Sequence, residues 1–428
     1  MEQIIYNTDV LVAGGGPAGV AAAVGAARQG KRVLLIEKNG YCGGMGTING
    51  AFCGYYTSAK SGPLTQLVHG FAGEFYDAMK ARGGVAEPYP FGDTYIVTND
   101  HLVWRETADA FLAEAGVQVL FHTVVTDVIV EENALAGVVI QNKGGCFLVR
   151  AGRFVDATGD GDLCAMAGVP YTYGKDGNTQ YATMMFRLSG VDVKKACSHS
   201  GAQIEKWMEE AEGRGYHLPR KHIYILPSPR EGEIVCNMTA VVKADGSLID
   251  AAKAEDMTEG EILGRRQVRE YERFLREYVP GFENCRLTDV GNELGIRQSR
   301  TIRCLQTLTN DDVLKAKKVS HPVAKSAWCI EAHGRDGIFM YYFDNEYYEI
   351  PYEAQIPVGI GNLITCGRAI SAEHEALASA RVTAQCFLTG YAAGCASSLS
   401  MDHGRGYEDI PFEELRALIE YGEEKENG

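Results

Sequence analysis

Three glycines near the start of the chain are spaced to bind phosphate. Gly14, Gly16 and Gly19 form the sequence G-x-G-x-x-G. In this pattern the first glycine permits a tight turn, the second lets a pyrophosphate approach the backbone, and the third lets a helix approach a strand. Glu37 follows Gly16 by 21 residues, where a carboxylate accepts hydrogen bonds from ribose hydroxyls and disfavours a 2′-phosphate. These residues predict a site for an adenine dinucleotide other than NADP.

A strand, a turn, a helix and a second strand are needed to position these side chains. Residues 9–13 form an apolar run that ends at Gly14, and residues 17–29 form a small, alanine-rich helical pattern. A second apolar run, residues 32–36, ends directly before Glu37. This order predicts a βαβ unit in which the positive end of the helix dipole meets the phosphates.

Segments further along the chain bear on the choice between NAD and FAD. Residues 41–54 (YCGGMGTINGAFCG) could pass their backbone close to a long cofactor. Residues 117–141 read as strands joined by a turn, and RFVDATGDGDL follows at 153–163. NLITCGRAIS at 362–371 is again a strand followed by glycine, and 382–399 is a second small-residue helix.

With these segments the chain resembles the FAD-dependent oxidoreductases of the two-dinucleotide-fold superfamily, the glutathione reductase and fumarate reductase-like flavoproteins. Residues 350–399 (IPYEAQ to ASSL) are similar to a largely bacterial family named only FAD-dependent oxidoreductase. The resemblance covers residues 5–165 and 290–400. It implies FAD as the cofactor and an α/β fold, in which a Rossmann-like, three-layer ββα FAD-binding domain carries an inserted α+β substrate domain.

The resemblance also implies which residues contact FAD. The pyrophosphate is expected to contact the first glycine turn, and the adenosine ribose the end of the second strand. The ribityl chain is expected to contact the second glycine segment, and the flavin the last strand and helix. Two residues depart from the family: Arg368 replaces a frequent acid, and Glu353 stands where a basic residue is common. The expected cofactor-binding residues are Gly14, Gly16, Pro17, Ala18, Gly19, Glu37, Lys38, Gly43, Gly44, Met45, Val124, Val125, Ala157, Thr158, Gly159, Gly367, Arg368, Arg381 and Val382.

Two-electron flavin chemistry needs a group that moves a proton and a cation that polarises a carbonyl or holds a carboxylate. His333 and His374 are the candidates for proton transfer, and Arg297 and Arg381 are the cations expected at the catalytic site. Arg300 is a further cation candidate. The competing interpretations are structural histidines and ion pairs that close domains. No metal site is expected.

Composition excludes several classes of protein. The chain has 428 residues and a formal net charge of −15, which disfavours nucleic acid and anionic membranes as partners. Its 12 cysteines include no Cys-x-x-Cys pair, so iron–sulfur and structural zinc sites are not expected. The N-terminal sequence lacks the pattern of a signal peptide, which favours a cytoplasmic location. We expect a discontinuous FAD-binding domain from residues 1–168 and 350–428, with the inserted domain at 169–349.

The sequence thus predicts an FAD-dependent oxidoreductase that transfers a hydride between flavin and a small organic substrate. It contains no second strand-GxGxxG-helix pattern, so NAD(P)H or an electron carrier would dock transiently. A homodimer is a further expectation. Two alternatives stay open: the flavin subunit of a multi-chain electron-transfer reductase, and a non-catalytic binding protein on the same fold, similar to the GDP-dissociation inhibitors.

Overall fold

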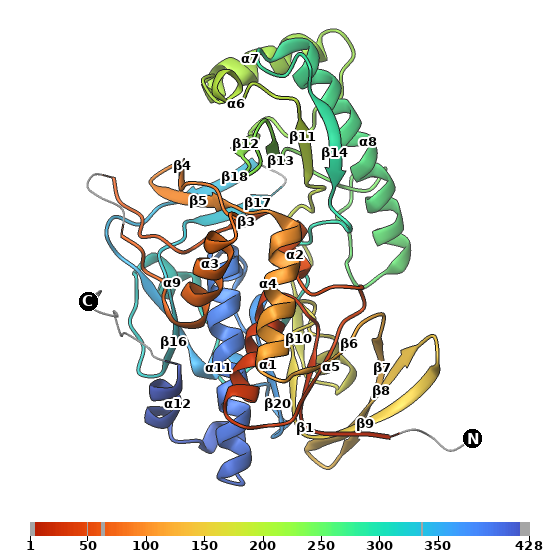
Figure 1. Ribbon diagram of the computed structural model, residues 1–428, viewed down its shortest axis with the longest axis vertical. Coiled ribbons are helices and arrows are strands. Elements are labelled where there is room, and N and C mark those ends of the chain that lie inside the picture. The colour runs from red at the N-terminus through yellow and green to blue at the C-terminus, as the bar shows by residue number, and fades with distance from the viewer. Residues whose placement is uncertain (1–4, 49, 61–64, 335–336, 420–428) are drawn as a thin grey trace.

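A mostly parallel sheet lies in the lower part of the molecule (Figure 1). The computed structural model describes residues 5–48, 50–60, 65–334 and 337–419. Within them β1 pairs in parallel with β2 and β9, β2 with β6, and β9 with β20, whereas β7, β8 and β9 form an antiparallel meander. The strands are β1 (Ile5–Ala13), β2 (Val33–Ile36), β6 (Gln118–Leu120), β7 (Val124–Glu131), β8 (Ala134–Asn142), β9 (Gly145–Asp156) and β20 (Leu363–Thr365).

Both faces of β1 are buried, which explains its continuous apolar sequence. Val10 and Val12 belong to a hydrophobic core with the helices α1 (Pro17–Arg28) and α11 (Thr383–Asp402). Leu11 and Ala13 pack on the opposite face in a second core, together with side chains of the meander. The layers are therefore meander, parallel sheet and helices, and the predicted α/β, three-layer ββα architecture is confirmed.

Helices α1 and α11 pack with their backbones in contact, because glycines remove the side chains between them. A Cβ atom built on Gly390 would lie 2.1 Å from the carbonyl oxygen of Ala18, and one on Gly394 would lie 2.1 Å from that of Ala22. No side chain other than hydrogen fits at these two positions in the observed geometry. The contact fixes the start of α11 relative to the start of α1.

Replacing Gly394 with alanine is expected to destabilise the protein by about 1–3 kcal/mol, because the two helices must separate to admit the methyl group. Thermal unfolding of the purified variant should show a lower midpoint than that of the parent protein. Gly201→Ala, in α7 (Gly201–Glu212), is the matched control, because a Cβ there meets no atom of the described residues within 4 Å. Equal midpoints for Gly394→Ala and the parent protein would contradict the close contact.

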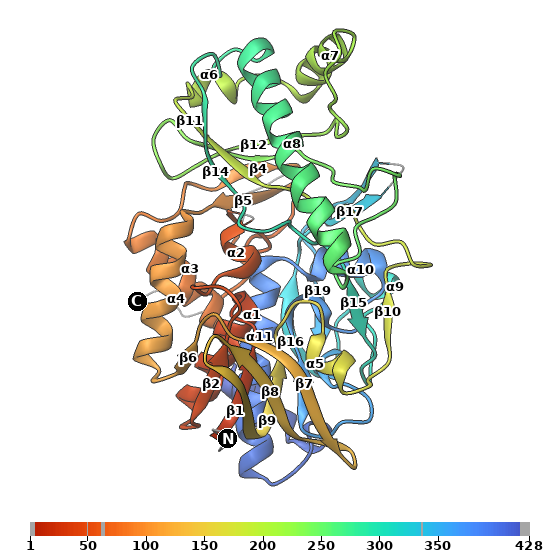
Figure 2. The ribbon, with the colours of Figure 1, turned by 90° about the vertical axis from the view of Figure 1, so that its right-hand side faces the viewer.

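A second body of the fold lies above the sheet in Figures 1 and 2, and its long helix α8 descends along the side of the molecule. Its four strands pair in the order β12-β13-β11-β14, and its hydrophobic core draws on residues from Ala182 to Ile296. Several side chains between 308 and 348 pack instead with the two ends of the chain. The elements are β11 (Phe186–Ser189), α6 (Val193–Ala196), α7 (Gly201–Glu212), β12 (Tyr224–Pro227), β13 (Ile234–Asn237), α8 (Ala254–Tyr278) and β14 (Arg286–Val290).

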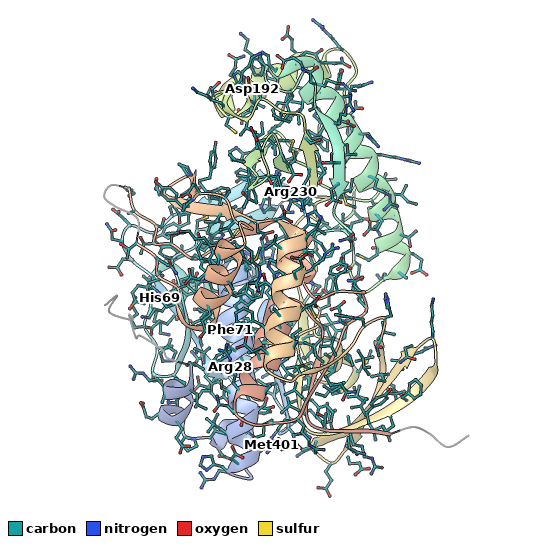
Figure 3. All side chains as sticks on the ribbon, in the orientation of Figure 1. Arg28, His69, Phe71, Asp192, Arg230 and Met401 are labelled. Atoms are coloured by element: carbon teal, nitrogen blue, oxygen red, sulfur yellow. The ribbon has the colours of Figure 1, made fainter. Side chains whose placement is uncertain are left out.

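Two arginines tie this upper body to the lower one. The guanidinium of Arg187 donates to the carboxylate of Glu233 at 3.2 Å and to the carbonyl of Asn99 at 3.0 Å, and all three residues are buried. Arg230, labelled in Figure 3, lies at the junction and binds Asp100, the residue that caps α4 (His101–Glu114), with its Nε atom 2.6 Å from the carboxylate. The upper body is thus held in a defined position.

Shorter elements surround the central sheet. Outside the two larger sheets, the described residues form three sheets of two strands and one of three. Among the residues that the structure describes, no helix has both the length and the apolar character needed to cross a bilayer. The remaining elements are α2 (Gly44–Ile48), β3 (Ala51–Phe52), α3 (Gly70–Ala81), β4 (Tyr89–Phe91), β5 (Thr94–Thr98), α4 (His101–Glu114), α5 (Asp162–Met166), β10 (Tyr171–Tyr173), β15 (Arg300–Ile302), α9 (Asn310–Leu314), β16 (Pro322–Ser326), β17 (Ile330–Gly334), β18 (Gly337–Tyr341), β19 (Tyr348–Pro351), η1 (Tyr352–Gln355), η2 (Gly367–Ala369), α10 (His374–Ala380), η3 (Tyr407–Asp409) and α12 (Phe412–Leu418).

Candidate active site

The first glycine turn has the geometry expected of a pyrophosphate cradle. Gly14 has φ +98°, and a Cβ on Gly19 would lie 1.8 Å from the carbonyl oxygen of Gly14, so the turn and the helix require glycine at both positions. Gly16 differs, because a Cβ there meets nothing within 4 Å. No side chain caps α1, which begins at Pro17 and Ala18 directly after Gly16. Open space in front of an uncapped helix start suits a diphosphate group.

Glu37 ends β2 and is buried beside the same turn. One oxygen of its carboxylate accepts from the backbone N–H of Gly15 at 2.7 Å, and the other accepts from that of Asn39 at 2.8 Å. Burial raises the pKa of Glu37, while the two backbone donors lower it. A carboxylate has about four lone-pair sites, so ribose hydroxyls can still bind it. The neighbouring Lys38 forms an ion pair with Glu293 of the upper body at 2.5 Å.

The second glycine segment returns to the first turn. The N–H of Gly43 donates to the carbonyl of Gly15 at 2.8 Å, and a Cβ on Gly44 would lie 3.1 Å from the Cα of Gly16. Met45 follows in α2 and packs at the edge of a small hydrophobic cluster. The structure therefore brings together the two glycine segments predicted to contact the cofactor.

Two further predicted segments lie close to these turns. The N–H of Ala157 donates to the carbonyl of Ala13 at 2.9 Å, at the carboxyl end of β1. Thr158 and Gly159 continue that loop. Val124 and Val125 open β7 directly after Thr123, whose N–H donates to the carbonyl of Glu37 at 3.0 Å.

Arg368 holds the loop after β9 to the last strand of the sheet. Its Nε atom donates to the carbonyl of Gly159 at 2.9 Å, and its Nη2 atom lies 2.6 Å from the carboxylate of Asp160. It also donates to the carbonyl of Ile296. The guanidinium is thus used in three contacts within the protein. Gly367, with φ +72°, lies against Ala18 at the start of α1.

A buried ionic cluster lies beside the start of α11. Glu331 and His333 are two residues apart on β17, so their side chains share one face of the strand, and a carboxylate oxygen of Glu331 lies 2.9 Å from Nε2 of His333. The guanidinium of Arg297 donates to the carbonyl of Tyr181 at 2.6 Å, and the N–H of Tyr181 donates to the carbonyl of His333 at 3.1 Å. Arg381 precedes Val382, the N-cap residue of α11, and donates to Gln180 at 3.1 Å.

The charges of this cluster determine which groups are ionised. Burial raises the pKa of Glu331, but the hydrogen bond from His333 and the guanidinium charges of Arg297 and Arg220 together lower it below its ordinary value, so the group remains a carboxylate. Burial, together with the charge of Arg297, lowers the pKa of His333 far below its ordinary value, so its imidazole is neutral. Because an ionised carboxylate only accepts hydrogen bonds, Nε2 of His333 carries the proton. Nδ1 is then the basic nitrogen, and the neutral ring can take up a proton there.

His374 lies at the start of α10, which packs against β17. It lines a cavity of about 540 Å³, and its Nδ1 atom is buried with no hydrogen-bond partner among the described residues. Gln298 and Thr301 line the same cavity, and each also has a buried oxygen without a partner. Burial lowers the pKa of His374, and the charge of Arg381 is among the smaller influences on it. Arg381 also donates to the carbonyl of Glu331 at 3.5 Å, so the same arginine is close to the β17 pair and to His374.

Several other residues singled out in the sequence make contacts outside the cluster. Arg300 is an ion-pair residue, because its guanidinium lies 2.7 Å from the carboxylate of Asp162. Glu353, one of the two departures from the family pattern, pairs with His321. Two tyrosines near β19 also have partners outside the cluster: Tyr348 donates to Ser379 in the core at 2.8 Å, and the ammonium of Lys318 lies 3.7 Å from the ring centroid of Tyr347.

Three residues of the cluster were missed in the sequence, namely Glu331, Gln180 and Arg220. Glu331 could have been found, because a strand over IEAHG places it on the same face as His333. Arg220 and Gln180 lie outside the strands and helices and carry no periodic signal. Only the folded chain brings them to this place.

The chain is similar to a known protein family and to several known proteins. The family described as FAD dependent oxidoreductase matches residues 9–419. A thiamine thiazole synthase from Aeropyrum pernix is 35% identical over 135 residues, which cover 32% of this chain and 44% of that protein. A digeranylgeranylglycerophospholipid reductase 2 from Methanothermobacter thermautotrophicus is 28% identical over 195 residues, which cover 43% of this chain and 48% of that protein. The chain thus spans less than half the length of these two relatives.

A solved structure shows the same fold. The crystal structure of a geranylgeranyl bacteriochlorophyll reductase-like protein from Thermoplasma acidophilum aligns with a TM-score of 0.51 and 15% sequence identity. The alignment covers 97% of this chain and 83% of that protein.

Proposed function

The chain belongs to the FAD dependent oxidoreductase family, and on that premise we propose that it transfers a hydride between FAD and a small organic substrate held beside the start of α11. The protein binds FAD and is an enzyme. The observation that carries the proposal is the buried pair of Glu331 and a neutral His333, with Arg297 and Arg381 against it. A neutral base next to fixed cations, close to a helix start, is the arrangement that proton-coupled hydride transfer requires.

Bound FAD supplies the acceptor or donor of two electrons as a hydride. In the direction of substrate oxidation, Nδ1 of His333 takes the proton that leaves the substrate with the hydride. Glu331 stabilises the resulting imidazolium, because its carboxylate already binds Nε2. Arg381 and Arg297 orient the substrate and balance negative charge that develops on it. For substrate reduction the same proton returns from His333.

His374 is proposed as a second proton-transfer residue, because its partnerless Nδ1 faces away from solvent on a cavity wall. We expect His374→Ala to keep its flavin and to lose about a hundredfold in the rate of flavin reduction or reoxidation. Stopped-flow absorbance under anaerobic conditions measures both rates. Unchanged rates in both directions would remove His374 from the mechanism and leave His333 in place.

The proposed function is tested by exposing purified holoprotein to candidate reductants without oxygen. NADH, NADPH and a panel of small organic metabolites are mixed singly with the enzyme while the flavin absorbance is recorded. Bleaching by a metabolite, and recovery with its oxidised product, supports the proposal. A protein that stays colourless after incubation with FAD, or a flavin that no compound reduces, would contradict it.

Several finer features belong to the same proposal. The relatedness to glutathione reductase and fumarate reductase-like flavoproteins is supported by the two glycine turns and by the ββα layers. The discontinuous domain of residues 1–168 and 350–428, with an insertion at 169–349, is supported by the separate core between Ala182 and Ile296. A cytoplasmic location, a transient NAD(P)H or electron-carrier partner, and a homodimer are retained on the reasoning from sequence alone.

A further inference from the structure

Three guanidinium groups lie around the Glu331–His333 pair; two of them are buried and that of Arg381 is half-buried. Arg220 and Arg297 are 6% and 7% exposed, and both donate to the same side-chain oxygen of Asn237, at 2.7 and 3.3 Å. Sharing one acceptor places their positive charges next to each other. Arg381 is close enough that its charge, with that of Arg220, lowers the pKa of Arg297.

Negative charge does not balance these three cations. Among the described residues, Glu331 is the carboxylate whose charge acts on all three guanidinium groups. His333 is neutral, so the four charged side chains sum to about two positive charges in a desolvated place. Buried cations are costly unless they are paired, which makes this cluster incomplete without an anion.

Hydrogen-bond donors in the cluster also lack acceptors. Nη2 of Arg220, Nε of Arg381 and Nε2 of Gln180 are buried, and each makes no hydrogen bond within the part of the chain that the structure describes. All three belong to residues that contact the cluster, since Gln180 accepts from Arg381 and Arg220 shares Asn237 with Arg297. Orphaned donors of this kind occur where a ligand supplies the acceptors.

We propose that Arg220, Arg297 and Arg381 bind a carboxylate group of the substrate, which makes the substrate an organic acid. This inference rests on the proposed function, because it names the substrate class of the same site. A carboxylate offers two acceptor oxygens in a plane, which match the guanidinium fork and use the orphaned donors. It also supplies negative charge where the cluster has an excess of positive charge. The carbon next to that carboxylate then lies near His333, which is where the proton is moved.

The proposal is tested by adding small acids to the oxidised holoenzyme while its flavin absorbance and thermal unfolding midpoint are recorded. Acetate, succinate and benzoate are compared with acetamide, succinamide and benzamide at constant ionic strength. We expect the acids to perturb the flavin spectrum or raise the midpoint, and the amides, which have similar shape but no charge, to bind at least about tenfold more weakly. Equal effects of acids and amides, or none, would overturn the carboxylate site. A response to phosphate or sulfate that exceeds every carboxylate would overturn it as well.

Substitutions of Arg220 test whether the arginines of the cluster bind the acid. Arg220→Met removes the charge with little change of length, and we expect it to weaken acid binding at least about tenfold while the flavin stays bound. Arg220→Lys keeps a positive charge but lacks the planar guanidinium, so it too is expected to bind acids weakly. This second variant tests the assignment even if Arg220→Met does not fold. Arg265→Met, an exposed arginine that pairs with Glu261 on α8, is the control and should bind like the parent. Unweakened binding in Arg220→Lys and Arg220→Met would overturn the assignment.

The outcome separates the two proposals. If the holoenzyme is reduced by an uncharged compound and binds none of the acids, the proposed oxidoreductase function stands and the carboxylate site is overturned. If the protein takes up no FAD that can be reduced, the proposed function itself is overturned.

Discussion

Replacing Gly16 with valine is expected to yield a folded protein that has lost its FAD. A Cβ at this position meets no protein atom within 4 Å, so the valine side chain would occupy only the space in front of the start of α1. That space is where the pyrophosphate must approach the backbone, so the substitution should reduce the ratio of flavin to protein by at least about tenfold. The ratio is measured from the absorbance of the purified variant after incubation with excess FAD.

Gly19→Ala is the matched comparison for this experiment. Its Cβ would lie 1.8 Å from the carbonyl oxygen of Gly14, so the damage falls on the packing of helix against strand. Gly16→Val should therefore unfold near the midpoint of the parent apoprotein, and Gly19→Ala well below it. A Gly16→Val protein that retains stoichiometric FAD would show that the pyrophosphate lies elsewhere.

His333→Gln is expected to lower turnover by about a hundred- to ten-thousandfold without loss of flavin. Glutamine keeps a donor toward Glu331 but has no basic nitrogen, so the proton that accompanies the hydride has no acceptor. Steady-state kcat and the flavin content of the same preparation are the measurements. His403→Gln is the control, because His403 also pairs with a carboxylate, that of Glu414 at 3.0 Å, outside the cluster. Equal losses in both variants would contradict a specific role for His333.

The pH profile distinguishes a base from a structural histidine. Burial lowers the pKa of His333, so its ring stays neutral below the ordinary histidine pKa of about 6.5, and kcat/KM should show no loss from its protonation between pH 8 and about 6.5. The charge of Glu331 raises that pKa. Glu331→Gln should therefore move the acid limb of the profile to lower pH. An unmoved limb would mean that another group sets it.

The first βαβ unit could be predicted from sequence because its signals are local. The predicted helix over 17–29 and strand over 32–36 differ from α1 and β2 by one residue at one end. Strand β1 instead begins at Ile5, four residues before the predicted start, because it pairs with β9 from Leu148 onward. That pairing joins residues more than 140 positions apart, and no local pattern reveals it.

The candidate site was predictable only in part for the same reason. His333, Arg297 and Arg381 were chosen as chemical types near the last strand, and the structure places all three in one cluster. Arg220 comes from the segment between α7 and β12, and only tertiary packing sets it beside Arg297. A lone arginine in an irregular segment gives no sign of the fold that will bury it.

The backbone contact between α1 and α11 has a consequence for which flavins the protein can hold. One helix starts at the predicted pyrophosphate turn and the other at the predicted flavin end, and Gly390 and Gly394 lock them against each other without intervening side chains. The two anchor points are therefore held at a fixed separation. Riboflavin, which has no phosphate, could reach only one of them, so the crossing of two helices selects for the distance between the isoalloxazine ring and the phosphate.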